Sequence, residues 1–502
     1  MSYRVYPVTE TELKHTGYRI KINGQDVETN TARVSAIPFN RRWPGHQRSE
    51  DQTELINFIS LETDEPLDFE IIPEEKPEKT VIRPLNLGIE PEIDENGSIR
   101  FTLEKPAYFT VEPYGRRNAL HIFADPISNY KTRQNSPETL YFGKGEHDVG
   151  LIELKSGQTL FIDAGAVVYA CIHAIDAENI SIVGRGILDN SKNKERILFE
   201  CNEENNEAAV NNAERDHTIQ LEYCTNVLID GITIRDSLVY NIRPIGCENL
   251  SIKNVKIIGC WRYNSDGIDM HNCINVEIDN CFLRTFDDSI CVKGFDCYYD
   301  GDIEEAVRKA MYRNGKAYDT FKNVLVKNCV IWNDWGKCLE IGAETRAKEI
   351  CDVLFTDCHI IHVTGPVLDC MNVDYADVHG ISYKNISVEL DDIIPLPMIQ
   401  KSDNHRYEPN TKNYCLELFV CEVLFHKEYS AGGKRRGINR DLLIENISIT
   451  GEHEVNLRFI GYSDEYCVRN INVRNIFLNG NKLKKENIKT HRNEYCRNIN
   501  ID

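Results

Sequence analysis

The sequence lacks the features that would direct it out of a cell or into a membrane. Residues 1–8 contain no basic segment followed by an apolar stretch of the kind that begins a signal peptide. No uncharged apolar run approaches the roughly 18 residues that a membrane-spanning helix needs. We therefore expect a cytoplasmic protein that does not bind membranes.

Positive charge is also scarce. There are 58 Lys and Arg residues against 79 Asp and Glu, so the net charge is −21. This balance argues against nucleic acid and anionic membrane surfaces as partners. It weighs as well against a long polyanionic substrate, unless a local basic pocket overrides the general field.

Cysteine is plentiful, but no two cysteines form a Cys-x-x-Cys pair that would build a zinc site. Without an export signal, the 18 cysteines are expected to be free thiols. Several follow an Asn or Asp in a repeated segment, where small buried side chains would stack. The histidines lack the spacing of helical metal ligands, so we predict no metal and no cofactor. The cysteines of the repeated segments are Cys273, Cys281, Cys329 and Cys358, and the histidines without metal-ligand spacing are His217, His359, His362 and His379.

Residues 1–125 differ in pattern from the rest of the chain. Short alternating apolar runs, such as 18–22 and 107–112, are separated by charged turns that contain proline, such as 73–78. Strands at short intervals without helical patterning predict an antiparallel β-sandwich over residues 1–125.

A loose repeat begins near residue 150. Its unit is an Asn or equivalent residue, a run of alternating residues and a second short strand. Units with no insertion between them lie 23 to 29 residues apart. This period is too short for a βαβ unit, and the leucine-rich frame is absent. We predict a right-handed parallel β-helix over residues 126–502. The units start at Asn179, Asn226, Asn249, Asn275, Asn323, Asp352, Gly380, Asp441 and Asn470.

Three longer gaps interrupt the repeat. Residues 302–311 predict a short helix on a loop, 202–217 a polar loop, and 391–440 a long excursion. Long loops on a repeat scaffold tend to surround its functional groove.

Two acidic motifs stand 21 positions apart, which is about one coil: residues 264–269 with Asp266, and residues 286–294 with Asp287 and Asp288. One coil of offset brings the three carboxylates together, so at least one pKa should rise and provide a proton donor. A donor beside carboxylates that can activate water is what a glycosidase needs. Asp269 is expected to face away, because it lies three residues after Asp266 in an extended strand. Asp and Asn are also common in solenoid turns.

These motifs, together with residues 163–169 and 184–189, resemble family 28 glycoside hydrolases, the polygalacturonase family. The resemblance implies a right-handed parallel β-helix with an open groove and hydrolysis with inversion. It implies that Asp287 is the general acid, and that Asp266 and Asp288 hold and deprotonate the attacking water.

The sequence departs from the family at two motifs. Lys337 stands where the family's Gly-His-Gly motif has histidine. The Arg-Ile-Lys motif should fall near residues 365–370, which contain Asp369 but no Arg or Lys. We therefore expect a neutral sugar at the cleaved bond.

Residues near the triad are candidates for binding the sugar. An aromatic ring can stack on a pyranose and an arginine can fork onto oxygens, whereas lysines would tune the negative triad. Surface aromatics and a solvated turn with a local ion pair at 344–346 are the alternatives. The predicted substrate-binding residues are Trp261, Arg262, Tyr263, Asn264, His271, Lys293, Lys337, Glu340 and Arg346.

The leading hypothesis is an inverting glycoside hydrolase that acts from the chain end on short imported oligosaccharides; a homo-oligomer is left open. A pectate-lyase-like enzyme would need calcium and release an unsaturated product. A noncatalytic solenoid such as an adhesin would bind sugar without turnover, and an epimerase is a weaker option.

Overall fold

The computed structural model describes residues 3–38, 50–128, 130, 137–193, 217–295, 311–390, 398–399, 408–409, 417–426, 430 and 435–502. The helix predicted at 302–311, the loop predicted at 202–217 and most of the excursion at 391–440 lie outside these residues. The described chain is built almost entirely of strands and turns. None of its helices is long and apolar enough to cross a membrane.

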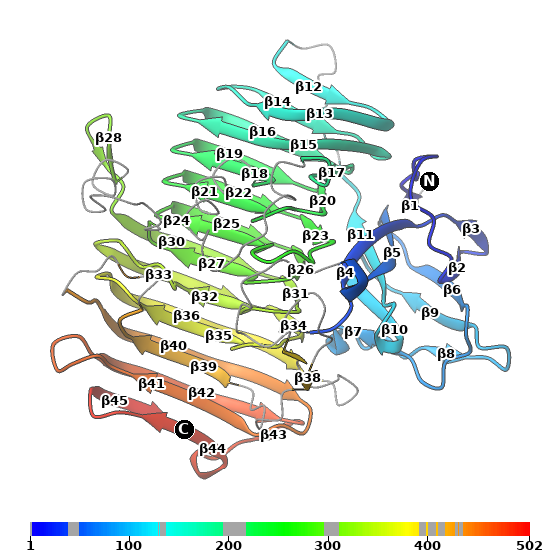
Figure 1. Cartoon of the computed structure of the whole chain (residues 1–502). Coiled ribbons are helices and arrows are strands. Elements are labelled where there is room, and N and C mark those ends of the chain that lie inside the picture. The colour runs from blue at the N-terminus through cyan, green and yellow to red at the C-terminus, as the bar shows by residue number, and fades with distance from the viewer. Residues whose placement is uncertain are drawn as a thin grey trace.

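The N-terminal strands form two sheets, drawn in blue and cyan in Figure 1. Their facing sides enclose a core that includes Phe69, Phe101 and Phe109. The pairing is antiparallel as predicted, except that β5 and β11 run parallel. One sheet contains β1 (Tyr3–Val5), β4 (Asn30–Ser35), β5 (Thr53–Thr63), β7 (Val81–Arg83), β10 (Tyr108–Arg116) and β11 (Leu120–Pro126). The other contains β2 (Tyr18–Ile22), β3 (Gln25–Val27), β6 (Leu67–Pro73), β8 (Glu92–Ile93) and β9 (Ile99–Leu103).

From residue 139 onward the chain winds into a right-handed parallel β-helix, which confirms the predicted fold. Each coil adds one strand to each of three parallel stacks. The first stack is β12 (Thr139–Phe142), β14 (Thr159–Ile162), β16 (Glu178–Gly184), β19 (Thr225–Asp230), β22 (Glu248–Lys253), β25 (Ile274–Asp279), β30 (Thr320–Lys327), β33 (Glu349–Thr356), the first parts of β36 (Asp377–Glu389), β40 (Ile438–Thr450) and β42 (Val468–Leu478), and β45 (Cys496–Ile501).

The second and third stacks continue each coil. The second is the first parts of β13 (Gly145–Glu153) and β15 (Ala166–Ile175), then β17 (Ile187–Asp189), β20 (Thr233–Arg235), β23 (Lys256–Ile258), β26 (Phe282–Thr285), β31 (Val330–Asn333), β34 (His359–His362) and the later parts of β36, β40 and β42. The third is the later parts of β13 and β15, then β18 (Ile219–Glu222), β21 (Ile242–Ile245), β24 (Ile268–His271), β27 (Ile290–Lys293), β32 (Leu339–Ile341), β35 (Leu368–Asn372), β39 (Glu417–Val423), β41 (Val455–Ile460) and β44 (Ile488–Arg492).

Three short antiparallel strand pairings occur in the described residues in addition to the three stacks. They are β28 (Tyr312–Arg313) with β29 (Lys316–Ala317), β37 (Met398–Ile399) with β38 (Glu408–Pro409), and β43 (Asn481–Lys482) on β42.

The repeated asparagines have a backbone role. Asn226, Asn249 and Asn275 have φ between 55° and 58°, the left-handed conformation that Asn tolerates better than most residues. Their side chains form a ladder along the first stack: the amide of Asn249 donates to Asn226 Oδ1 at 3.0 Å, and that of Asn275 donates to Asn249 Oδ1 at 2.9 Å. The repeat seen in the sequence is therefore the turn that opens each strand of this stack.

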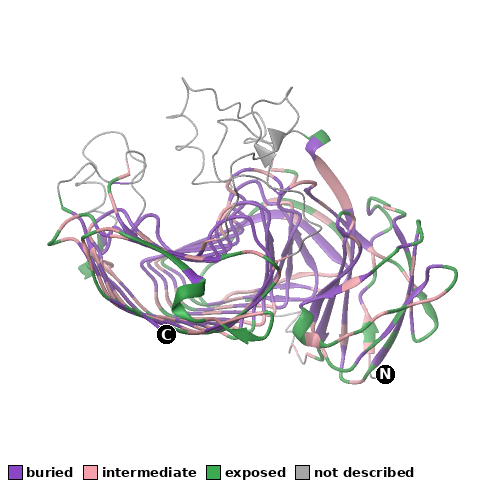
Figure 2. Cartoon of the chain, turned by 90° about the horizontal axis from the view of Figure 1, so that it is seen from below, coloured by how far each residue is buried: buried purple, intermediate pink, exposed green. Residues whose placement is uncertain are grey.

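The interior of the solenoid is a continuous column of Ile, Val, Leu and Cys side chains. Figure 2 shows buried residues along the inside of the stacked coils. All cysteines in the described part of the chain are free, and Cys273, Cys281, Cys329 and Cys358 are buried as predicted.

The N-terminal sandwich packs against the second stack. Apolar contacts join Phe58 and Phe123 to Phe282 and Trp332. Buried ion pairs and hydrogen bonds cross the same interface, many of them between groups less than 10% exposed. They include Glu12–Arg235 at 2.6 Å, Asp125–Arg185 at 3.1 Å, Asp125–Lys256 at 3.1 Å, Arg83–Glu389 at 2.6 Å, Glu112–His362 at 2.9 Å, His121–Arg284 at 3.5 Å and Arg116–Asp334.

Candidate active site

The two acidic motifs lie on neighbouring coils, in the turns that lead from the second stack to the third. Strand β24 pairs with β27, with Ile268 beside Ile290. Ahead of these strands, the backbone N–H of Gly267 donates to the carbonyl of Asp288 at 2.9 Å. The offset of 21 positions is therefore one coil, as the sequence predicted.

Asp266, Asp287 and Asp288 converge on one point. Each contributes a carboxylate oxygen to a group whose atoms all lie within 4.8 Å of one another. Asp266 is only 2% exposed, whereas Asp287 and Asp288 are partly exposed and accessible to a ligand. Asp287 has a φ of 155°, near the edge of a region that residues with side chains rarely adopt.

Two buried asparagines fix the backbone of these turns. The Asn333 amide donates to the carbonyl of Asp287 at 2.8 Å and also to Ser289 Oγ at 3.1 Å. Asn241 does the same one coil away, donating to the carbonyl of Asp266 at 2.7 Å. Both asparagines are fully buried, so the carboxylates are carried by a rigid frame rather than by a loose loop. Sequence reasoning missed both residues.

Lys293 lies on one side of the triad, near the end of β27. Its Nζ is 2.7 Å from Asp269 Oδ2, 3.6 Å from Glu344 Oε2 and 3.8 Å from Asp266 Oδ2. The ammonium also lies over the ring of Tyr240, 5.2 Å from its centroid. This lysine therefore balances several carboxylates at once.

Lys337 lies on the other side, in the turn before β32. Its backbone N–H donates to Asp288 Oδ1 at 2.8 Å. Its Nζ contacts Glu340 and lies 3.4 Å from Asp369 Oδ2. Glu340 and Asp369 are adjacent in the pairing of β32 with β35, so one cation serves two buried carboxylates.

The surroundings separate the acidities of the three aspartates. Burial raises the pKa of Asp287 well above its ordinary value, and the neighbouring charge of Asp288 raises it further. Burial and the charges of Asp269 and Asp287 likewise raise the pKa of Asp266. Burial also acts on Asp288, but the positive charges of Lys337 and Lys293 outweigh it, and the pKa of Asp288 falls. The surroundings thus raise the pKa of two carboxyls and lower that of the third, which is the separation that an acid and a base in one site need.

The predicted sugar-binding residues 261–264 differ from one another in what their side chains contact. The Trp261 indole donates to Asp236 Oδ1 at 3.0 Å, and Arg262 contacts the same carboxylate while lying 4.1 Å from the Trp261 ring centroid. Asn264 occupies a left-handed turn position with φ 59°. The prediction that Tyr263 binds sugar is wrong. Its ring is fully buried and packs on Phe286 and Trp335 in the solenoid core, so it cannot stack on a sugar.

His271 and Arg346 are also held by the protein. His271 is 2% exposed, with Nδ1 2.9 Å from the carbonyl of Gly294. Arg346 is 2% exposed and its Nη2 lies 3.3 Å from Asp374 Oδ2. The alternative of a solvated turn at 344–346 is therefore wrong, because all three residues are buried and less than 5% of each is exposed to solvent.

The expectation that Asp269 faces away is also wrong. Asp266 belongs to the turn before β24 rather than to the strand, so the alternation of side chains does not connect the two positions. Asp269 points to the same lysine as Asp266. Asp269 and Glu344 both pair with Lys293, one of the lysines predicted to tune the triad.

The three aspartates have the oxygen chemistry of a site for a hard cation. Lys293 and Lys337, however, already bring positive charge to this point. The arrangement fits acid–base chemistry by the carboxyls themselves.

Comparisons with known proteins agree with this geometry. The model of the glycosyl hydrolases family 28 matches residues 151–427. A polygalacturonase from Gossypium barbadense is 24% identical over 262 residues, which cover 47% of this chain and 60% of that protein. An exopolygalacturonase from Oenothera organensis is 26% identical over 261 residues, covering 46% of this chain and 69% of that protein. The chain thus spans less than two thirds of the cotton protein's length.

Among solved structures, Dex49A from Penicillium minioluteum superposes with a TM-score of 0.57 over 99% of this chain and 98% of that chain. At 12% identity this is a likeness of fold, and it extends over the N-terminal sheets as well as the solenoid. The family match covers more than half of the sequence and includes both acidic motifs. The chain therefore belongs to the glycosyl hydrolases family 28.

Proposed function

We propose that the chain is a glycoside hydrolase that cleaves its bond by inversion, with Asp287 as the general acid. The observation that carries the proposal is the pairing of a carboxyl whose pKa is raised, Asp287, with an adjacent one whose pKa is lowered, Asp288. Asp287 would give its proton to the leaving oxygen. Asp288 would take the proton of the attacking water, and Asp266, whose pKa is raised, would help to orient that water.

The distance between the carboxyls bears on whether the reaction inverts or retains the anomeric configuration. One oxygen of each carboxylate lies within 4.8 Å of the others, whereas inversion needs about 6.5–9.5 Å between the acid and base carboxyl groups so that water fits between them. The close approach of these oxygens makes a retaining reaction through a covalent intermediate the second candidate. We propose inversion because the motifs match those of the family, and the configuration of the first product decides between the two.

We also propose a neutral sugar at the cleaved bond. Lys293 and Lys337 each face at least two buried carboxylates. Bringing a uronate beside these groups would add a further buried negative charge, which costs several kcal/mol unless it is paired. The proposal departs from the polygalacturonases that the chain resembles.

Action from the chain end on short oligosaccharides is supported by the similarity to the exopolygalacturonase of Oenothera organensis. Placement in the cytoplasm remains our proposal, supported by the free thiols of the described cysteines. Fractionation of the source cells, followed by detection of the protein, tests this placement.

The test of function is incubation with a panel of oligosaccharides and with polygalacturonic acid, while the first product is followed by NMR. We expect a short oligosaccharide with a neutral sugar at the cleaved bond to be hydrolysed to a monosaccharide of inverted configuration. A retained anomer would replace the inverting mechanism by a covalent one. Rapid release of galacturonic acid would overturn the neutral-sugar proposal, and its loss in Lys337→Ala would identify Lys337 as the uronate clamp.

A further inference from the structure

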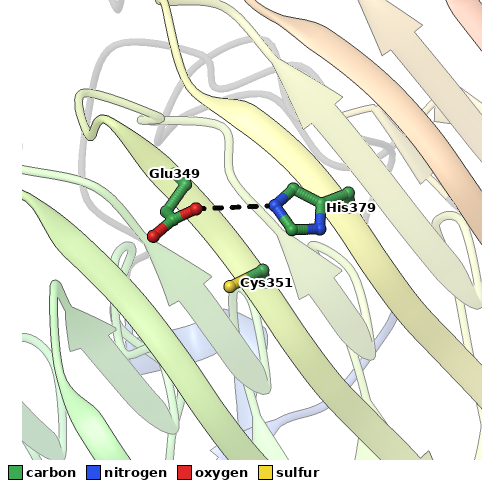
Figure 3. A group of neighbouring side chains, drawn as sticks. All are labelled: Glu349, Cys351 and His379. Carbon is green, nitrogen blue, oxygen red and sulfur yellow. Dashed lines mark ion pairs between the residues drawn. The ribbon is translucent and has the colours of Figure 1, made fainter.

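A mixed group of possible metal ligands lies on the first stack, away from the acidic motifs of the third. Glu349 and Cys351 are two residues apart on β33, and His379 is the register partner of Cys351 on β36. Figure 3 shows Glu349 and His379 facing one another, with Cys351 beside them. One ligand atom from each lies within 4.8 Å of the other two, and His379 Nε2 is 3.6 Å from Glu349 Oε2.

The backbone arrangement explains why these side chains meet. Residues two apart on a strand share a face, and adjacent strands lie about 4.8 Å apart, so such a pair and the register partner form a compact triangle. Ile350 between them belongs to the core, whereas Cys351 does not pack with that cluster. Cys351 is 4% exposed, but the side chains of Glu349 and His379 are 35% and 23% exposed, so an ion can reach the group from solvent.

Thiolate, imidazole and carboxylate together select a particular class of ion. Calcium and magnesium prefer oxygen ligands alone, whereas zinc accepts sulfur, nitrogen and oxygen in one tetrahedral site. Three protein ligands leave a fourth position for water. The bonds of about 2.0–2.3 Å would require the three side chains to close slightly, which their rotatable bonds allow.

The neighbouring charges permit a cation at this point. Lys322 and Arg440 lie in the same row, as register partners of Cys351 and His379. Arg440 is already paired with Asp377 at 2.9 Å and with Asp441, which leaves Lys322 as the cation that opposes metal binding.

We propose that Glu349, Cys351 and His379 form a zinc site on the outer face of β33 and β36. Zinc binding replaces the thiol proton of Cys351 by a zinc–sulfur bond, and the proton is released to solvent; no oxidation or reduction takes place.

The experiment is a titration of the reduced full chain with Co²⁺, followed by displacement with Zn²⁺. We expect one equivalent of cobalt to produce a thiolate-to-metal absorption band that zinc abolishes. Cys351→Ser should remove the band, and His379→Ala should weaken zinc binding by at least about tenfold. Lys322→Gln should strengthen it.

Cys291→Ser is the matched control, because the Cys291 thiol lies near two acidic residues of the active site, Asp288 and Glu340. The control should keep the band. A band that persists in Cys351→Ser, or that disappears only in Cys291→Ser, would overturn the proposal. Failure of the parent protein to bind one equivalent of cobalt or zinc would do the same. Thermal unfolding of each variant verifies that it is folded.

Discussion

The backbone N–H of Lys337 lies 2.8 Å from Asp288 Oδ1, so the turn before β32 supports the carboxylate of the preceding coil. The side chain of the same lysine adds its charge to that support, and the pKa of Asp288 is lowered despite its burial. Lys337 therefore lowers the pKa of the proposed base, Asp288, while burial and the charge of Asp288 raise the pKa of Asp287 beside it.

Replacement of Asp287 by Asn should abolish most of the activity. The substitution retains the shape of the side chain but removes the proton donor, and general acid catalysis contributes about 10²–10⁴-fold. The measurement is kcat on the best substrate of the panel, with thermal unfolding as the check on folding. Activity within threefold of the parent would assign the acid to another residue, with Glu340 next in line.

Replacement of Lys337 by Met should move the acidic limb of the pH profile of kcat/KM to higher pH. The lysine charge lowers the pKa of Asp288, so its loss lets that carboxyl become protonated at a higher pH, and a protonated base cannot activate water. Lys337→Arg keeps the charge and is the control whose limb should remain near that of the parent. An unchanged limb in Lys337→Met would show that Asp288 is not the titrating base.

Replacement of Arg116 by Met should impair catalysis from outside the site. Arg116 of the N-terminal sandwich contacts Asp334, and this carboxylate precedes the turn that carries Lys337. Breaking a buried ion pair costs up to about 3–5 kcal/mol, although Arg284 and Trp332 still bind Asp334.

We expect the Arg116→Met variant to show a lower melting temperature, a reduced kcat and an acidic limb displaced to higher pH, because the Lys337 backbone moves away from Asp288. Arg116→Lys should recover part of each effect. A lower melting temperature with an unchanged pH profile would assign Arg116 a purely structural role.

Replacement of Asn249 by Ala should destabilise the solenoid by about 1.5–3.5 kcal/mol. Up to about 1–2 kcal/mol arises because Ala lacks the short polar side chain that lets Asn tolerate the left-handed conformation. A further 0.5–1.5 kcal/mol, roughly, comes from the ladder hydrogen bonds to Asn226 and Asn275. Urea unfolding gives the difference. Asn249→Gly relieves the backbone cost and should be less harmful; equal losses would assign the whole effect to the ladder.

Much of the solenoid was predictable because its turns have a chemical signature. Asn179, Asn226, Asn249 and Asn275 stand where each coil needs a left-handed residue, so the spacing of a single residue type revealed the coils. The same spacing placed Asp266 one coil from Asp287, and the structure brings them together.

The rest of the site depended on contacts that no repeat encodes. Tyr263 follows the aromatic Trp261, yet the turn directs its ring into the core. Asp269 meets Lys293 because the turn before β24 interrupts strand alternation. Asp334 meets Arg116 across more than two hundred positions, and sequence spacing carries no information about such a contact.

The buried ion pairs between the N-terminal sandwich and the second stack have a consequence for unfolding. An array of coils that touch only their neighbours can fray one coil at a time from an end. Here a single folded unit contacts seven successive coils, through Arg185, Arg235, Lys256, Arg284, Asp334, His362 and Glu389. The sandwich therefore couples coils that do not touch one another. We expect the region between β17 and β36, which contains both acidic motifs, to open as one cooperative unit in hydrogen exchange. The coils beyond β40 should open earlier.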